Sequence, residues 1–251
     1  MKYLYGSGEG AAISVQAWRA LTDYVAKRIR HRPRDSVILA AGADLQSPRF
    51  APCGGKPFAA VFDADETVLL NLGFEYDAAT GTPYSDARWE EWERTGARQV
   101  APVPGAVDAL RALRRMGVKV IFNTNRLARY AAANEAAIEG AGLGPARHGD
   151  TLYLQGDDAT GRNKDGRRAM IAAHYCVIAM GGDQLGDFSD RFAMPSVPAR
   201  RAATLAGPIA AKWGAGWFVL PNPVYGTGLK GSLDDVFPAA KRWPTQSVRE
   251  K

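Results

Sequence analysis

A five-residue apolar run, Phe58 to Phe62, ends abruptly in two carboxylates, Asp63 and Asp65. A continuous apolar run of this length is typical of a strand buried on both faces of a parallel sheet. Ligands bind at the carboxyl ends of such strands, and alternate strand positions share a face, so both acids are expected in one small volume. Two carboxylates so near each other repel unless a cation or a shared proton compensates their charge. The pattern therefore predicts a metal site or an acid–base site. A strand that ends in a solvated acidic turn would leave the same local pattern, so other segments must decide.

The composition is that of an ordinary globular protein. Of the 251 residues, 46% are hydrophobic and 23% are charged, which suits one α/β domain over residues 1–251 with a substantial core. No run of about 18 apolar residues is present, so no membrane-spanning helix is expected. The net charge is +6, but the basic residues form no stripe with interleaved aromatics. We therefore expect no nucleic-acid polymer as a partner.

Further apolar runs predict strands and helices that alternate along the chain. The later predicted strands are 118–122, 152–154, 176–180 and 217–220. The predicted helices are 14–31 with Ser14 as its cap, a helix from Pro104 to Gly117, 128–141 and 168–174. This alternation favours right-handed crossovers, so we expect a three-layer α/β fold with helices on both faces of a parallel sheet.

Two segments lack a strong strand pattern. Residues 32–57 are rich in proline and glycine and are expected to form a connection rather than a second domain. Residues 72–102 are rich in aromatic and charged side chains. We expect them to form a small cap-like insertion near the ends of the strands.

Polar side chains follow three of the predicted strands. They are Asp63 and Asp65, Thr124, and Asp183 with Asp187. Lys164 lies between the second and third of these groups. Mg²⁺ prefers oxygen ligands, and a lysine with a hydroxyl can hold phosphoryl oxygens, so the set suits Mg²⁺-assisted phosphoryl transfer.

These clusters resemble the four motifs of the haloacid dehalogenase (HAD) superfamily. The matching stretches are residues 61–69, 124–126, Lys164 and residues 182–188. More narrowly, the chain resembles the class C acid phosphatases, the lipoprotein e(P4) 5′-nucleotidase group, which residues 89–92, 104–107 and 220–226 also match. The resemblance covers residues from about 5 to 230 and implies a HAD-like (Rossmannoid) fold.

The resemblance implies a mechanism for an acid phosphatase. Asp63 would attack phosphorus and form a phosphoaspartyl intermediate. Asp65 would protonate the leaving alcohol and then deprotonate the attacking water. Thr124 and Lys164 would bind the transferring phosphoryl group.

The resemblance also implies a metal site and a substrate. Mg²⁺ would be held by Asp63, the backbone carbonyl of Asp65 and Asp183, with Asp187 ordering a metal-bound water or Lys164. The substrate would be a small phosphomonoester, nucleotide-like and best represented by a 5′-nucleotide. The residues expected to contact it are Thr124, Asn125, Arg126, Lys164 and Tyr225.

Cellular location and assembly are left with alternatives. The resemblance implies a periplasmic protein or an outer-membrane lipoprotein. The segment after Met1 lacks the apolar core of a secretory leader, so either a leader and its membrane tether are absent from this chain or the protein is cytoplasmic. Cys53 and Cys176 are too few for a disulfide scaffold, but they could pair in an exported protein. The oligomeric state is open between a monomer and a homodimer.

Three other interpretations compete. Residues 147–149, Arg-His-Gly, imitate the signature of histidine phosphatases, with His148 as the reactive residue. Residues 226–231 match a lone G-x-G-x-x-G, but no βαβ unit has room to follow, so a loop is expected. The chain could also keep the HAD fold as a catalytically inactive surface or binding protein. The full set of Asp63, Asp65, Lys164 and Asp183 argues against that alternative.

Overall fold

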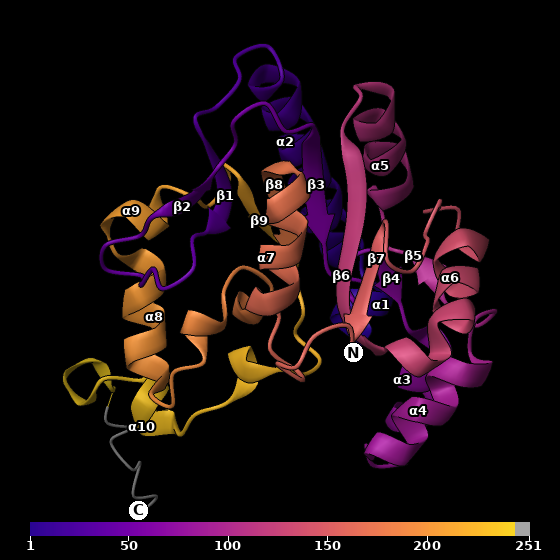
Figure 1. Cartoon of the computed structure of the whole chain (residues 1–251). Coiled ribbons are helices and arrows are strands. Elements are labelled where there is room, and N and C mark those ends of the chain that lie inside the picture. The colour runs from indigo at the N-terminus through magenta and orange to yellow at the C-terminus, as the bar shows by residue number, and fades with distance from the viewer. Residues whose placement is uncertain (244–251) are drawn as a thin grey trace, which may run out of the picture.

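A central five-stranded parallel sheet organises the computed structural model, which describes residues 1–243 (Figure 1). The strand order is β7–β6–β3–β8–β9. The bounds are β3 Phe58–Phe62, β6 Lys119–Leu127, β7 Leu152–Gln155, β8 Cys176–Gly182 and β9 Trp217–Val219. Phe62 is in register with Phe122 of β6 and with Gly181 of β8. The carboxyl ends of the three middle strands therefore meet at one edge.

Helices and two small antiparallel pairs surround this sheet. The pairs are β1 Asp35–Leu39 with β2 Phe50–Pro52, and β4 Leu69–Leu70 with β5 Ala101–Pro102. The helices are α1 Lys2–Gly6, α2 Gly8–Arg28, α3 Leu72–Ala79, α4 Asp86–Thr95, α5 Ala106–Arg115, α6 Ala131–Gly140, α7 Asp165–His174, α8 Val197–Leu205, α9 Gly207–Ala210 and α10 Leu233–Val236.

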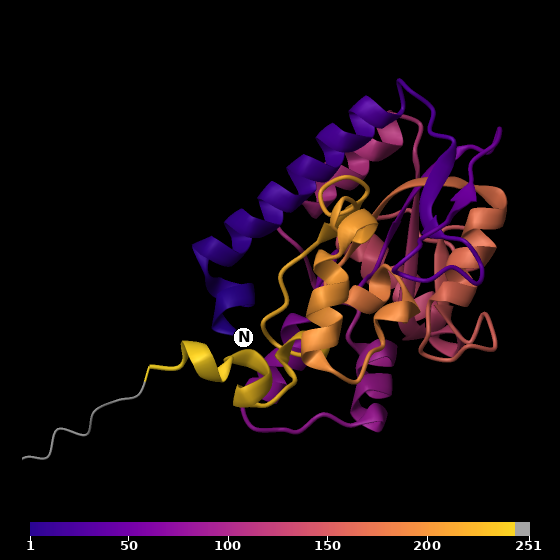
Figure 2. The same ribbon diagram turned by 90° about the vertical axis from the view of Figure 1, so that its left-hand side faces the viewer.

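The sheet separates two hydrophobic cores, as the alternation of side chains along β3 requires. Ala60 and Phe62 face the core under α2, α5 and α6, where the Trp18 ring lies 5.3 Å from that of Phe62. Ala59 and Val61 face the core under α7, α9 and β1. Figure 2 shows the long α2 running along one flank of the molecule. The predicted three-layer fold with helices on both faces is confirmed.

The first long helix begins earlier than the sequence predicted. Helix α2 starts at Gly8, and the side chain of Ser7 accepts a hydrogen bond from the backbone N–H of Gly10 at 2.9 Å. Ser7 is therefore the N-cap. Ser14, the predicted cap, is buried inside the helix and donates to the carbonyl of Gly10 at 3.0 Å. The start was misplaced because Ser14 is also a residue type that favours N-caps, and the apolar spacing that predicted the helix begins just after it.

The stretch 32–57, expected to be only a connection, contains β1 and β2. Val37 and Ile38 of β1 are buried in the core under α7. The Trp217 indole N–H donates to the carbonyl of Val37 at 2.8 Å. The strands were missed because they are short and their stability depends on packing against distant residues rather than on their own pattern.

Cys53 and Cys176 form a disulfide, with their Cα atoms 4.5 Å apart. The bond joins the turn before β3 to the first residue of β8, and both cysteines are fully buried. The pairing considered for an exported protein is therefore present. Within residues 1–243, no helix is long and apolar enough to cross a membrane.

Candidate active site

The acidic residues lie where β3 and β8 end. The backbone N–H of Asp63 donates to the carbonyl of Gly181 at 3.0 Å, so the pairing of the two strands continues to the first acid. Asp183 follows β8 directly, and Asp187 ends the short 3₁₀ turn after it. A Cβ atom on Gly182 would meet the Cβ of Asp187 at 2.3 Å. Only glycine at this position allows the turn to fold back over the strand.

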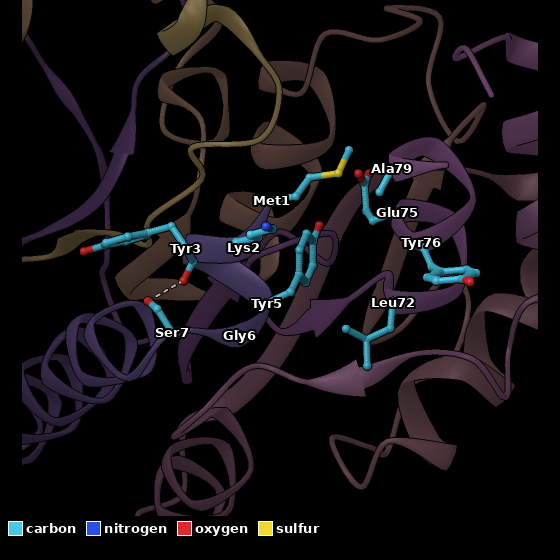
Figure 3. Close-up of a pocket in the computed structure, with 10 residues that line it drawn as sticks. All are labelled: Met1, Lys2, Tyr3, Tyr5, Gly6, Ser7, Leu72, Glu75, Tyr76 and Ala79. Carbon is cyan, nitrogen blue, oxygen red and sulfur yellow. Dashed lines mark hydrogen bonds between the residues drawn. The ribbon is translucent and has the colours of Figure 1, made fainter. Parts of the chain in front are cut away.

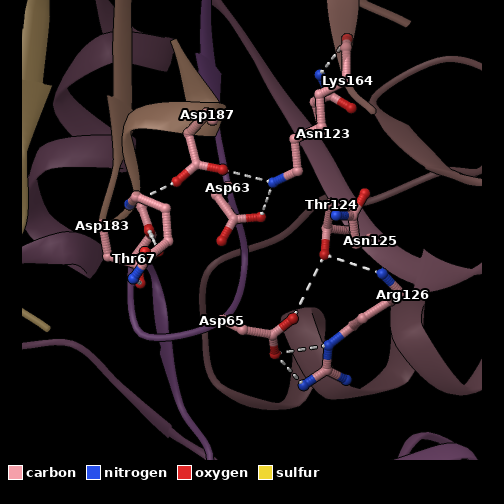
Figure 4. A network of polar contacts seen from close by, with 12 residues as sticks. Asp63, Asp65, Thr67, Asn123, Thr124, Asn125, Arg126, Lys164, Asp183 and Asp187 are labelled. Atoms are coloured by element: carbon pink, nitrogen blue, oxygen red, sulfur yellow. Dashed lines mark hydrogen bonds and ion pairs between the residues drawn. The ribbon is translucent and has the colours of Figure 1, made fainter. Parts of the chain in front are cut away.

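Lys164 connects these acids (Figure 4). Its Nζ lies 2.6 Å from Oδ1 of Asp63 and 2.6 Å from Oδ1 of Asp187. One carboxylate oxygen each from Asp63, Asp183 and Asp187 lies within 4.8 Å of the others. The side chains of the two ion pairs are at most 9% exposed. Four of the predicted residues therefore form one buried cluster.

Burial shapes the charges of this cluster. It raises the pKa of the Asp63 carboxyl well above its usual range, with the Lys164 ammonium opposing the rise. It raises the pKa of Asp183 to about 7, and the nearby Asp187 carboxylate adds to the effect. Burial alone would lower the pKa of Lys164, but Asp187 and Asp63 raise it above its usual value. The lysine is therefore a cation held by two acids.

Polar neighbours hold Asp183 in place. Its Oδ1 accepts from the hydroxyl of Thr67 at 3.1 Å. Its Oδ2 accepts from the amides of Gln184 at 2.9 Å and Asn222 at 2.7 Å. Neutral donors of this kind orient a carboxylate without neutralising it. Three carboxylates beside one ammonium leave net negative charge, and the donors are oxygens, so the set fits a hard divalent cation.

The side chain of Asp65 lies apart from the cluster and is held by a buried arginine. Its Oδ1 accepts from Arg126 Nη2 at 2.7 Å and Nε at 2.9 Å, and from the Asn71 amide at 3.0 Å. Among residues 1–243, its Oδ2 has one hydrogen-bond partner, the Thr124 hydroxyl at 3.4 Å. Figure 4 shows this separation. The metal prediction for Asp65 concerned its backbone carbonyl, so the position of the side chain does not bear on it.

Arg126 was predicted to contact the substrate but lies inside the protein. It is 2% exposed, and besides Asp65 it donates to the side-chain oxygens of Asn134 at 3.1 Å and Asn71 at 2.8 Å. Its donors are therefore directed to protein atoms, and its contact to the site runs through Asp65.

Glu66 and Asn71 are organising residues that sequence reasoning missed. Glu66 has a φ of +52° and is 1% exposed. It accepts hydrogen bonds from the Tyr5 hydroxyl at 2.9 Å and from the Asn71 backbone at 3.0 Å. Burial raises its pKa to about 7. The sequence shows an acid and an amide on either side of Thr67. These two side chains converge only with the left-handed backbone conformation of Glu66, which sequence patterns do not reveal.

Three further predicted contact residues differ in their placement. Thr124 is fully buried beside Asp65 and accepts from the backbone N–H of Arg126 at 3.2 Å. The Asn125 side chain binds Arg167 at 2.6 Å and the Arg162 carbonyl at 2.9 Å, so it ties down the loop before Lys164. The Tyr225 hydroxyl donates to Glu66, while its side chain is partly exposed.

The competing motifs do not form a second site. The His148 ring lies 2.7 Å from Oδ1 of Asp157, in an exposed pair outside the cluster. Residues 226–231 form a 3₁₀ turn over Thr227–Leu229 rather than the start of a nucleotide-binding helix. The expected loop at this position is confirmed.

Comparison with known proteins agrees with this geometry. The sequence profile described as "HAD superfamily, subfamily IIIB (Acid phosphatase)" matches residues 10–228. Two crystal structures of the class C acid phosphatase from Bacillus anthracis, one of them with tungstate bound, share 24% identity with the chain and superpose with a TM-score of 0.72. The first covers 90% of this chain and 83% of the other, and the second covers 89% and 82%. No curated protein sequence matched.

The profile spans most of the chain, and the structural likeness supports the same fold. Because the profile is that of an acid phosphatase family with the HAD fold, it supports neither a histidine phosphatase that uses His148 nor a catalytically inactive surface or binding protein. The chain belongs to subfamily IIIB of the HAD superfamily, the acid phosphatases, and is a phosphoric monoester hydrolase.

Proposed function

We propose that the protein hydrolyses small phosphomonoesters in a Mg²⁺-dependent reaction through a phosphoaspartyl intermediate on Asp63. The observation that carries this proposal is the position of Lys164, whose Nζ lies 2.6 Å from both Asp63 and Asp187, two of the three acids that cluster with Asp183. A buried ammonium beside a carboxylate nucleophile lowers the repulsion that an incoming phosphate dianion would meet.

In the first step, an Asp63 oxygen would form a bond to phosphorus while the bond from phosphorus to the leaving oxygen breaks. The leaving oxygen would take a proton from Asp65. We assign that proton to Oδ2 of Asp65, because Oδ1 already accepts three hydrogen bonds from Arg126 and Asn71. In the described part of the chain, Oδ2 has only the 3.4 Å contact to the Thr124 hydroxyl.

In the second step, the same oxygen of Asp65 would take a proton from water as the water attacks phosphorus and Asp63 is released. Arg126 stabilises the charged carboxylate that this step requires. Thr124 and Lys164 would hold the phosphoryl oxygens. The tungstate in the similar Bacillus anthracis structure is a tetrahedral oxyanion like phosphate, which supports an oxyanion site in this fold.

Asp63, Asp183 and Asp187 are the side chains that would hold Mg²⁺, together with the backbone carbonyl of Asp65. When bound, the ion would supply positive charge for the phosphoryl oxygens. Asp187 also binds Lys164 at 2.6 Å, so it fits the predicted role of ordering the lysine. The fit rests on the three oxygen donors of Asp63, Asp183 and Asp187, which lie within 4.8 Å of one another, and on the raised pKa values of the Asp63 and Asp183 carboxyls.

We further propose a nucleotide-like substrate, with residues 72–102 acting as a small cap. This segment supplies the aromatic side chains Phe74, Tyr84 and Trp89, whose rings pack edge to face. Tyr225 would contact the leaving group. Aromatic faces of this kind can stack on a flat base.

The disulfide between two buried cysteines favours an oxidising compartment, which supports export to the periplasm or cell surface over a cytoplasmic location. A membrane tether, as the family resemblance implies, stays a proposal. A homodimer stays a proposal, to be tested by light scattering.

Turnover of p-nitrophenyl phosphate and of a panel of 5′- and 3′-nucleotides tests the proposal. We expect activity that EDTA abolishes and Mg²⁺ restores, and a loss in Asp63→Asn of more than about 10²-fold in kcat. Asp23→Asn, an exposed acid on α2, is the matched control and should keep full activity. An Asp63→Asn protein that turns over normally would refute the nucleophile. Equal kcat/KM for all esters would refute the nucleotide preference and leave the chemistry standing.

A further inference from the structure

Two buried amide side chains flank the guanidinium of Arg126. Arg126 Nη2 donates to Oδ1 of Asn71 at 2.8 Å, and Nη1 donates to Oδ1 of Asn134 at 3.1 Å. Both asparagines are fully buried. The guanidinium orients Asp65 (Figure 4), and it is itself held on both sides by these amides.

Trp92 of α4 fixes the first amide. Its indole N–H donates to Oδ1 of Asn71 at 3.0 Å. Indole and guanidinium nitrogens are donors only, so they hold the amide oxygen toward themselves and direct the NH₂ group of Asn71 to Asp65, 3.0 Å away. The indole is itself closely packed, because a Cβ atom on Gly96 would meet its ring at 2.3 Å. The direction of the Asn71 amide therefore depends on the position of α4.

Glu93, the next residue of α4, reaches the second amide. Its Oε2 accepts from Nδ2 of Asn134 at 3.3 Å and from the backbone N–H of Leu127 at 2.7 Å. Leu127 ends β6, the strand that carries Arg126. Glu93 is 1% exposed, and a buried carboxylate is stable only with partners of this kind. Two adjacent residues of one helix thus hold the amides on both sides of the guanidinium.

Helix α3 supports α4 from the other side. Phe74 of α3 packs against the rings of Trp89 and Trp92 at 5.0 and 6.1 Å. The opposite face of α3 borders an open cleft of about 870 Å³ next to α1 (Figure 3). None of the residues that hold Arg126 lines this cleft. In the part of the chain that the structure describes, α4 is therefore the helix of the insertion that contacts both amides.

We infer that Trp92 and Glu93 are positioning residues for Asp65, so that α4 serves proton transfer to the leaving group. The inference rests on the proposed function, in which Asp65 protonates the leaving oxygen. The network fixes one oxygen of Asp65 and thereby directs the other. A small rotation of this carboxylate would misplace its proton. Attack by Asp63 would continue, because Lys164 holds that carboxylate separately at 2.6 Å.

Two esters that differ in their need for a proton test the inference on the full chain with Mg²⁺. The p-nitrophenolate group leaves phosphorus without a proton, whereas the alkoxide of benzyl phosphate needs one. The value of kcat/KM reports the steps up to the departure of this group. Asp65→Asn should lower kcat/KM for benzyl phosphate more than about 10²-fold and that for p-nitrophenyl phosphate far less. Equal changes in Asp65→Asn would refute Asp65 as the acid, and the inference with it.

Trp92→Phe keeps an aromatic ring but removes the N–H that Asn71 accepts. We expect kcat/KM for benzyl phosphate to fall about three- to tenfold, the effect of losing one hydrogen bond, and that for p-nitrophenyl phosphate to change less than about twofold. Trp213→Phe is the matched control. Its indole N–H also donates to a carbonyl, that of Thr204 at 2.9 Å, but it packs against the core under α7 and α9. The ratio of the two kcat/KM values should stay at the wild-type level in this control.

Glu93→Leu removes the contact to Asn134 and leaves Trp92 in place. It should show the same selective loss on benzyl phosphate, so the inference does not depend on Trp92→Phe folding well. A selective loss in these variants is the result that a purely structural role would not produce. Equal losses on the two esters in both variants, or wild-type values in both, would overturn the inference while leaving Asp65 as the acid.

Discussion

At the scale of single residues, the two oxygens of Asp65 have different surroundings. One oxygen is fixed by Arg126 and Asn71, while the other has a single long contact among the residues that the structure describes. This asymmetry solves a problem that any acid–base carboxylate faces, since it must be held still and must also exchange a proton. The buried guanidinium orients the group, and the free oxygen is available for chemistry.

Asp65→Asn tests this division. The amide keeps an oxygen for Arg126 but cannot act as a base, so the phosphoenzyme should form and its hydrolysis should stall. With p-nitrophenyl phosphate, whose leaving group departs without a proton, we expect kcat to fall about 10²–10⁴-fold. Mass spectrometry of acid-quenched protein should find phosphate on Asp63. The double variant that also carries Asp63→Asn should show none. A fall in kcat without trapped phosphate would contradict the role of Asp65 as the base.

At the scale of elements, the site depends on how β8 is held beside β3. The turn after β8 carries Asp183 and Asp187, and β3 leads into Asp63. The disulfide joins the other end of β8 to the turn before β3. The strand pair is therefore tied covalently at one end and by the acids and Lys164 at the other.

Loss of the disulfide should lower stability more than activity. The bond closes a loop with a sequence separation of 123 residues, so Cys53→Ala with Cys176→Ala should reduce the free energy of unfolding by about 2–4 kcal/mol. Urea unfolding measures this change. The reduced wild type serves as the control, because it loses the crosslink but keeps both buried side chains. Equal free energies for oxidised and reduced wild type would contradict the prediction.

At the scale of the whole molecule, the buried acids couple folding to metal binding. Asp63, Asp183 and Asp187 come from segments that only the folded chain brings together. A cation that binds them binds the native state and not the unfolded chain. Binding therefore adds to global stability.

Thermal unfolding with and without Mg²⁺ tests this coupling. At about 100 times the dissociation constant, Mg²⁺ should stabilise the protein by about 2.7 kcal/mol. Asp183→Asn should remove most of that gain because it takes away one of three carboxylates. Asp23→Asn should keep the gain. A Mg²⁺-independent midpoint in the wild type would argue against a metal at these acids.

Prediction from sequence worked where local patterns carry the information. The apolar runs ending at Phe62 and at Met180 identified two central strands, β3 and β8, because a doubly buried strand must be apolar throughout. The polar residues that follow them were correctly placed at one edge. Arg126 was different, since an arginine that follows a strand gives no sign of whether it will face a ligand or a buried carboxylate.

The sequence by itself determined the layered fold, the edge that carries the acids and the family to which the chain belongs. Only the tertiary structure decided that Glu66 and Asn71 support Asp65, and that β1 covers one core. The physical reason is the separation in sequence between the residues that interact. Strand burial and helix periodicity are repeated within a few residues, whereas these contacts join segments whose separation in the sequence leaves no periodic trace.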